Sequence, residues 1–292
     1  MPVRKALLQT TMLAGIVGAV YFSASSARAA DTIPLKAPPY LPAPAVDYVN
    51  GKIDAFGGSL ANRSIFGSKG ALSVPLGGQW GAQIDGAVGS FDSRAFGAVA
   101  GHLFWRNPSQ VLLGIYASHT YWDQFGGLHV SQVAGEGEYY LGNWTLQGIA
   151  GVEFGNSRSN ITATAIDTYD IQTRFFDQIN LKYYLIDNWN AYVGHRYLGG
   201  KNALALGTEY ALPLGRGLMA SGFIEGRVGE DDFHGIWGGL RFYFGQKDKT
   251  LIARHRQDDP NVWSLDTLFS IINNQSFEGA PSPPAADLCV SC

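Results

Sequence analysis

The residues that could do chemistry are few and scattered. Cys289 and Cys292 form a C-x-x-C pair near the end of the 292-residue sequence and are its two cysteines. This spacing could form a disulfide or take part in thiol exchange in an oxidising compartment. The six histidines form no local metal-ligand motif, and no G-x-S-x-G nucleophile motif occurs. We therefore predict neither an enzyme nor a cofactor or metal site.

A cluster of acidic residues, Glu230, Asp231 and Asp232, lies in a predicted turn. Its carboxylates could bind Ca²⁺, but their spacing matches no calcium-binding loop. A solvated turn is the simpler interpretation. The net charge of −3 gives no indication of a nucleic-acid partner.

A larger group of ionisable residues recurs at alternate positions of short apolar stretches. Because successive side chains of a strand point to opposite faces, this spacing puts charge on one face and apolar groups on the other. Charged groups cannot face hydrocarbon cheaply, so we predict that they line the lumen of a barrel. They are Asp85, Glu136, Glu138, Arg174, Lys182, Arg196, Glu209, Glu225, Arg227 and Arg241.

The alternation continues from about Val49 to Gly245 and is interrupted by turn residues. It predicts twelve strands, most of them long enough to cross a bilayer when tilted. Their ranges are 49–59, 67–76, 79–90, 94–106, 110–122, 128–141, 144–155, 170–186, 189–198, 202–213, 217–228 and 234–244.

The fold predicted from these strands is all-β, a transmembrane antiparallel up-and-down β-barrel. Eight or ten strands are the alternatives in number, and a soluble β-sandwich is the alternative fold. Charged residues make up only 15% of the sequence, against roughly 25% in soluble domains. The predicted connections alternate between tight turns and more variable loops, such as "ANRSIFG" and 155–169. Outer-membrane barrels have short periplasmic turns and longer external loops.

The apolar positions of many strands end in large aromatic side chains at the end with the short turns. Aromatic residues gathered at one level are typical of the girdle at a membrane interface. One residue does not fit, because Asp177 falls on the lipid-facing positions of its strand. The predicted girdle consists of Trp80, Trp105, Tyr139, Trp144, Tyr183, Trp189, Tyr210 and Phe244.

The N-terminal region has a different character from the barrel. Arg4 and Lys5 precede a mostly apolar run, and Ala27-Arg28-Ala29 forms an A-x-A site. This pattern predicts a secretory signal peptide over 1–29, cleaved near Ala29. A proline-rich linker follows at 30–48, and the barrel occupies 49–245.

We predict that residues 246–292 form a periplasmic tail, so that both termini of the mature chain are periplasmic. Asp258 or Asp259 followed by Pro260 is a helix-start signal. A short amphipathic helix could then pack on the barrel mouth, on the inner leaflet or on a periplasmic partner. Its apolar face would carry Val262, Leu265, Phe269 and Ile272.

The chain resembles the outer-membrane β-barrel proteins of α-proteobacteria, of the porin-like and surface-antigen type. The resemblance covers about residues 1–245 and rests on texture, as in "PLKAPPYLPAPA", "FWRNPSQVLLGIYASHTYWDQFG" and "AGEGEYYLGNWTLQGIAGVEFG". It implies envelope structure, surface exposure or passive diffusion, and no catalytic residues. The strand number and the extended tail depart from the many such antigens that have eight strands.

Three functions follow as hypotheses. The first is a porin-like passive diffusion channel or an envelope structural protein of the bacterial outer membrane. The second is a surface binding or adhesion barrel that uses the 155–169 loop, and the third is a lipid-modifying barrel enzyme. The expected partners are outer-membrane lipids and the barrel assembly machinery. Strand pattern alone does not place the two signs of charge around the wall, so it leaves the lumen open or occluded.

Overall fold

The computed structural model describes residues 43–162, 164–245 and 247–279. The predicted signal peptide, most of the proline-rich linker and the Cys289–Cys292 pair lie outside the described residues. Two helices, α1 (Leu251–Gln257) and α2 (Thr267–Ile272), accompany the strands. The strands are β1 (Asn50–Leu60), β2 (Arg63–Gly77), β3 (Trp80–Phe91), β4 (Arg94–Asn107), β5 (Val111–Trp122), β6 (Leu128–Leu141), β7 (Trp144–Gly155), β8 (Ser157–Ile161), β9 (Ala165–Asp170), β10 (Arg174–Ile186), β11 (Trp189–Leu198), β12 (Lys201–Gly215), β13 (Leu218–Gly229), β14 (His234–Phe244) and β15 (Gln275–Gly279).

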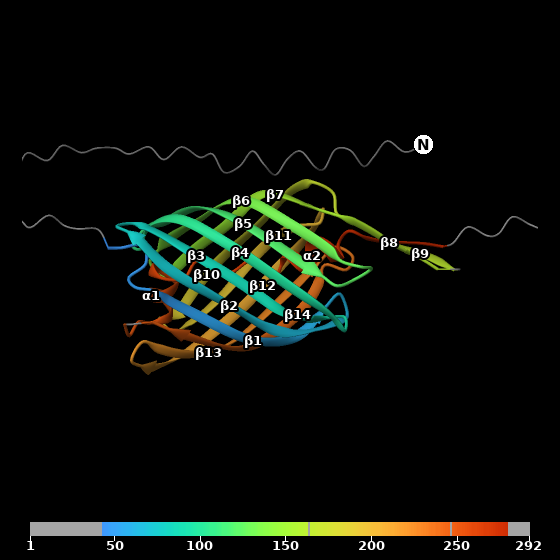
Figure 1. Cartoon of the computed structure of the whole chain (residues 1–292). Coiled ribbons are helices and arrows are strands. Elements are labelled where there is room, and N and C mark those ends of the chain that lie inside the picture. Colours follow the sequence, from blue (N-terminus) through green and yellow to red (C-terminus); the bar gives the residue numbers. More distant parts are fainter. Residues whose placement is uncertain (1–42, 163, 246, 280–292) are drawn as a thin grey trace, which may run out of the picture. The chain divides into compact units, whose positions relative to one another are not determined.

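Twelve of these strands close into one barrel in the order β1-β14-β13-β12-β11-β10-β7-β6-β5-β4-β3-β2 (Figure 1). Every neighbouring pair is antiparallel, and β1 closes the ring by pairing with both β2 and β14. The predicted fold class and the twelve strands are therefore confirmed. Closure excludes the β-sandwich, which has two sheets with open edges.

The predicted strand boundaries lie within a few residues of the observed ones, with one clear exception. The stretch "ANRSIFG" was expected to be a longer loop, but β2 already begins at Arg63. Ala61 and Asn62 both have positive φ, as a tight two-residue hairpin turn requires. Sequence reasoning missed this turn because it contains no glycine.

The two ends of the barrel differ mainly in one connection. The turns at 78–79, 108–110, 142–143, 187–188 and 216–217 gather at what we call the short-turn end. At the opposite end, 61–62, 92–93 and 199–200 are equally tight, so the predicted alternation is weaker than expected. Only the connection from β7 to β10 is long, and we call this the long-loop end. β8 and β9 form a hairpin within that connection.

The two faces of the wall have opposite chemistry. In β6 the side chains alternate between buried and more exposed positions along the strand. Exposed side chains on the outside of the barrel include Val133 of β6 and Leu113 and Ile115 of the neighbouring β5. Charged and amide side chains occupy the buried, inward positions. The outer surface is therefore apolar, as a strand facing hydrocarbon must be.

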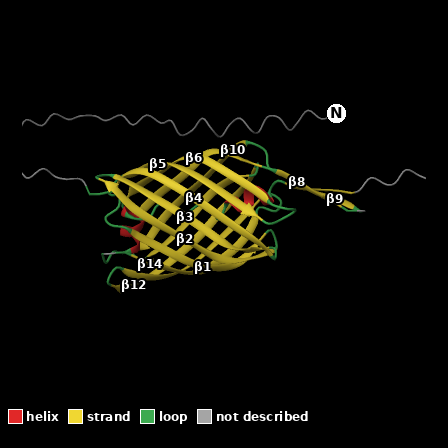
Figure 2. Ribbon diagram, in the orientation of Figure 1, coloured by secondary structure: helices red, strands yellow, loops and turns green. Residues whose placement is uncertain are grey.

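The C-terminal segment runs through the inside of the barrel. After β14 the chain turns back at the short-turn end, where Leu251 of α1 packs beside Tyr184, Met219 and Tyr243. Further along, α2 packs against β6 and β11. Figures 1 and 2 show α1 and α2 near opposite ends of the barrel. We call residues 250–274 the plug.

Beyond the plug, β15 pairs antiparallel with β9, from Gln275 opposite Tyr169 to Gly279 opposite Ala165. The described chain thus starts at the short-turn end and finishes at the long-loop end. The expected periplasmic tail at 246–292 therefore packs inside the barrel over residues 250–274. The helix prediction failed in detail, because Asp258 is the C-cap of α1 and residues 259–266 separate the two helices.

Candidate functional site: the charged lumen and its plug

All ten residues predicted to line the lumen are on inward positions of the wall. Most are almost fully buried, and Arg174 is partly exposed near the long-loop end. The same face also carries ionisable residues that the sequence analysis did not single out. These are Lys52, Asp54, Lys69, His102, Arg106 and Glu153.

The two signs of charge are unevenly distributed around the wall. The arc from β3 to β7 carries Asp85, Glu136, Glu138 and Glu153, with Arg106 and His102 as its basic groups. The opposite arc, from β10 through β14 to β1 and β2, carries Asp54, Glu209 and Glu225. It also holds most of the basic groups, namely Lys52, Lys69, Arg174, Lys182, Arg196, Arg227 and Arg241. Acidic and basic residues therefore face each other across the lumen.

In the acidic arc, His102 bridges two carboxylates. Its Nδ1 lies 2.9 Å from Oε2 of Glu136, and its Nε2 lies 3.0 Å from Oδ2 of Asp85. Tyr116 packs edge-on against the imidazole ring. Contacts from both nitrogens to carboxylates favour the doubly protonated ring, which donates on both sides. Sequence reasoning missed this group because its three members come from β3, β4 and β6.

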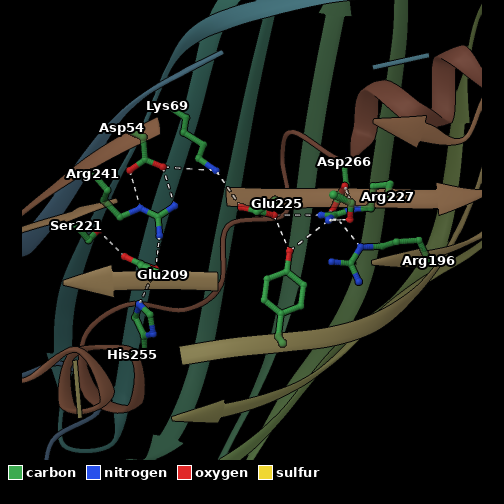
Figure 3. Close-up of polar contacts among 12 residues, drawn as sticks. Asp54, Lys69, Arg196, Glu209, Ser221, Glu225, Arg227, Arg241, His255 and Asp266 are labelled. Atoms are coloured by element: carbon green, nitrogen blue, oxygen red, sulfur yellow. Dashed lines mark hydrogen bonds and ion pairs between the residues drawn. The ribbon is translucent and has the colours of Figure 1, made fainter. Parts of the chain in front are cut away.

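In the basic arc, Arg241 of β14 joins the carboxylates of Asp54 in β1 and Glu209 in β12. Its guanidinium donates twice to Asp54, at 2.7 and 2.8 Å, and once to Glu209, at 2.7 Å. Lys69 lies 3.5 Å from Asp54 and 3.9 Å from Glu225. These pairs are formed within the wall and fix the direction of the side chains (Figure 3).

The plug is held to the basic arc by one carboxylate. Asp266, just before α2, accepts from Nε of Arg196 at 3.0 Å and from Nε and Nη2 of Arg227 at 2.8 Å. Figure 3 shows both guanidinium groups pointing at this carboxylate. Trp237 lies under Arg227, with its ring centroid 4.6 Å from the guanidinium carbon. All three charged side chains are nearly inaccessible to solvent.

The plug also contacts the acidic arc. The hydroxyl of Ser270 donates to Glu153 at 2.6 Å, and the same carboxylate accepts from the backbone N–H of Gly199 at 2.7 Å. Gly199 has φ of +60°, and a Cβ there would lie 2.6 Å from Cβ of Asn273. A glycine is therefore required where the rim of the barrel meets the plug.

An apolar cluster surrounds α2 towards the long-loop end. Phe269 is fully buried, and its ring centroid lies 4.6 Å from that of Phe233 and 6.4 Å from that of Trp237. Trp263 and Leu268 belong to the same buried cluster. This packing excludes water from the passage at the level of α2.

At the short-turn end, Asp47, which precedes β1, makes polar contacts with the plug and with Lys249 just before it. Lys249 lies 2.7 Å from Asp258 and 3.3 Å from Asp47, and the backbone N–H of Asp47 donates to Asp258. Partial burial opposes ionisation of Asp47. The hydrogen bond from Lys247 and the charge of Lys249 outweigh that burial, so the pKa of Asp47 lies below its usual value of 3.8.

What remains of the lumen is a cavity of about 60 Å³ between the plug and the basic arc. On the usual allowance of roughly 10–15 Å³ per water, it has room for about four to six water molecules. Its lining includes Lys52, Lys182, His255 and Asp259. The plug therefore occupies the lumen, with apolar contacts around α1 and α2.

The predicted girdle residues are on the outer face, near the short-turn end. Trp80 is opposite Trp105, Trp144 is opposite Tyr183, and Trp189 is opposite Tyr210 in the register. Tyr139 and Phe244 point outward at the same end. Trp105 is the least exposed of the eight, being only partly accessible.

The remaining singled-out residues are peripheral to the lumen. Asp177 does lie on an outward position, where its Oδ1 is 2.9 Å from Nδ1 of His195. Glu230, Asp231 and Asp232 form the turn between β13 and β14, and Lys201 pairs with Asp231. Within residues 43–162, 164–245 and 247–279, no three His, Cys, Asp or Glu side chains are grouped to hold a metal ion.

Closure, antiparallel pairing and an apolar exterior define a transmembrane β-barrel of the outer-membrane class. Among the described residues, no helix has the length and apolar character needed to span a bilayer. The chain matches no protein-family model. A comparison with curated proteins found no match either.

Solved structures similar to this chain are bacterial outer-membrane barrels. An outer membrane channel from Pseudomonas putida F1 is 10% identical, with 71% of this chain and 98% of that chain covered, at a TM-score of 0.47. The β-domain of the Bordetella autotransporter BrkA is 12% identical, with 68% and 99% covered, at 0.42. The translocator domain of the autotransporter NalP from Neisseria meningitidis is 11% identical, with 68% and 86% covered, at 0.42. Similarity at this level concerns the fold type, and the functional argument rests on the lumen itself.

Proposed function

We propose that this protein is an outer-membrane channel that its own C-terminal plug keeps closed. The observation that carries the proposal is the charged wall behind the plug. Two arcs of opposite sign face each other across the lumen, and the plug carries the Asp266 carboxylate that Arg196 and Arg227 share. With the plug displaced, these groups would line an aqueous passage and orient polar solutes across it.

A barrel whose lumen is always filled by the plug would not need a charged wall for its stability. Replacing buried ion pairs by well-packed apolar side chains is often neutral or stabilising by about 1–4 kcal/mol. A lumen that always faces the plug would therefore gain by becoming apolar, as it is around Phe269. Charges along the rest of the wall fit a surface that water reaches when the plug moves.

A disulfide between the barrel wall and the plug tests the channel proposal. The hydroxyls of Thr120 in β5 and Thr267 in α2 are 2.5 Å apart, so cysteines at both positions can form a disulfide. The experiment uses Asp266→Asn to loosen the plug, in a background with Cys289 and Cys292 changed to serine. In planar bilayers, the loosened protein should show discrete conductance steps. Adding Thr120→Cys and Thr267→Cys should abolish the steps under oxidation and restore them on reduction.

The single cysteine variants are matched controls and should conduct in either redox state. Folding of each protein is checked by heat-modifiable gel migration. If the loosened, folded protein never conducts, the channel proposal is wrong and a structural role in the envelope becomes the better account.

A surface-binding role is the second candidate, and the small sheet β8–β9–β15 favours it. This sheet joins the long connection to the end of the described chain, and it exposes Ile161 and Phe277 at 73% and 70%. Deleting 157–170 should then abolish binding to a ligand or cell while the barrel still folds. The same deletion would leave the conductance of the loosened channel in place.

We propose no enzymatic activity. His195 contacts Asp177 and Asn202, whereas His119 contacts Ser131 on another part of the wall. Ser221 and His255 both contact the carboxylate of Glu209, but the serine donates to the carboxylate and not to the histidine, so this cluster lacks the nucleophile–base hydrogen bond of a hydrolytic triad. The proposed partners are outer-membrane lipids around the apolar exterior and the machinery that assembles barrels. We place the short-turn end in the periplasm, because the predicted girdle is there and the one long connection lies at the opposite end.

A further inference from the structure

The cavity between the plug and the basic arc has a charge pattern that the channel proposal does not explain. Six lysine and arginine side chains and four carboxylates belong to its lining. Most of the basic groups have a carboxylate partner, as Lys69 has in Asp54 and Arg241 has in Glu209. Two lysines on opposite sides of the ring are exceptions.

Lys182, in β10, is only 6% exposed and lines the cavity. Within the part of the chain that the structure describes, its ammonium group makes no hydrogen bond and no ion pair. Lys52, in β1, is 7% exposed and donates only to the backbone carbonyl of Pro260, at 3.3 Å. Burying an ammonium group without an anionic partner costs several kcal/mol.

A polar side chain close to Lys182 also has a hydrogen-bond donor without an acceptor in the described chain. Asn190 is opposite Tyr184 in the register, and Lys182 is opposite Tyr192, so Asn190 and Lys182 are diagonal neighbours on the inward face. The amide nitrogen of Asn190 is buried and has no hydrogen-bond partner among the described residues. The Oε1 acceptor of Gln147 is likewise unpartnered in the described chain.

One carboxylate opposes the two ammonium groups. Asp259 of the plug lines the same cavity, and neither of its oxygens has a hydrogen-bond partner in the described chain. His255 is held between the hydroxyls of Tyr184 and Tyr243. The whole lining carries six lysine and arginine side chains and four carboxylates, and Asp54 beside it pairs with Lys69 and Arg241. Six positive against five negative charges leave a surplus of one positive charge around the cavity.

We infer that this cavity binds a small inorganic anion, with Lys182 and Asn190 as its donors on one wall and Lys52 on the other side. The anion supplies the missing negative charge and accepts from the unused donors. A volume of about 60 Å³ holds chloride with water, or one phosphate, whose five heavy atoms take the space of about four to six waters. The inference does not depend on whether the channel conducts.

The test measures anion binding by the full-length protein in detergent. Broadening of the chloride NMR signal and of the phosphate phosphorus signal are the two direct probes. Midpoint temperatures of heat-modifiable migration are recorded in chloride, phosphate and gluconate at equal ionic strength, since gluconate is too large for the cavity. We expect saturable binding of chloride or phosphate, with a matching rise in the midpoint temperature over gluconate.

Lys182→Gln should weaken this binding about tenfold or more, since a hydrogen bond to a charged group is lost. Asn190→Ala is a second variant that keeps all the charges and should weaken binding more modestly. Lys201→Gln, which removes a lysine at the rim, should leave the affinity unchanged. Chloride and phosphate are distinguished by which of them saturates. The inference is overturned if the wild-type protein binds neither anion, or if Lys182→Gln and Asn190→Ala both bind as the wild type does.

Discussion

At the scale of single residues, one carboxylate of the plug is shared by two arginines of the wall. Asp266 accepts three hydrogen bonds from Arg196 and Arg227, and these three side chains are almost completely buried. Removing the negative charge leaves two guanidinium groups facing each other without compensation. Breaking a buried ion pair in this way typically costs about 3–5 kcal/mol.

Asp266→Asn should therefore lower the free energy of unfolding by about 3–5 kcal/mol, with the loss confined to release of the plug if the barrel stays folded. Hydrogen exchange of residues 259–272 should accelerate while exchange of the barrel strands stays slow. Glu278→Gln is the matched control, because Glu278 carries the same charge on the exposed strand β15. Equal protection of the plug in both variants would show that Asp266 does not hold it.

The inward positions of the wall illustrate what residue types can predict. Charges at every second position, such as Glu136 and Glu138, can only point to one side of a strand, so their orientation was predictable. Their partners were not predictable, because Glu136 of β6 contacts His102 of β4, which lies two strands away in the barrel. Asp54 and Lys69 lie within the predicted strands 49–59 and 67–76, but the sequence analysis did not single them out.

At the scale of elements, the strands and the plug differ in how their structure is specified. Strands β3 to β7 and β11 to β14 were predicted within a few residues, because alternation and turn residues are local signals. The plug helices have only seven and six residues. Isolated helices of this length are marginal in water, since nucleation costs more than a few hydrogen bonds return. Their structure must come from packing inside the barrel.

A synthetic peptide covering residues 247–279 should consequently be unstructured in water. Far-UV circular dichroism should show a coil spectrum, even though Thr250 caps the first turn of α1. Helical content comparable to that of α1 and α2 in the isolated peptide would contradict this expectation and would mean that the plug folds before it enters the barrel.

At the scale of the whole molecule, the described chain crosses the barrel thirteen times, twelve times as a wall strand and once as the plug. Residues 44–47 lie at the short-turn end, where Gln257 donates to the carbonyl of Pro44. β15 lies at the other end, paired with β9. The two ends of the described chain thus lie at opposite ends of the barrel.

This topology predicts different labelling of two cysteine variants on intact cells. In a background with Cys289 and Cys292 changed to serine, Phe277→Cys should react with a membrane-impermeant maleimide, because Phe277 is 70% exposed at the long-loop end. Ser109→Cys, in a turn at the short-turn end, should react only after the outer membrane is permeabilised. Labelling of both variants, or of Ser109→Cys alone, would contradict the proposed orientation.

The sequence by itself determined the wall of this protein: an antiparallel barrel of twelve strands, apolar outside and charged inside. It could do so because strand periodicity is a local property, repeated in every hairpin. Only the tertiary structure decided that a segment of the same chain occupies the lumen. An apolar face such as that of Leu265 and Phe269 can pack on a membrane, a partner or a barrel interior. The choice depends on whether Asp266 meets Arg196 and Arg227, and those three residues come together only when the ring has closed around the plug.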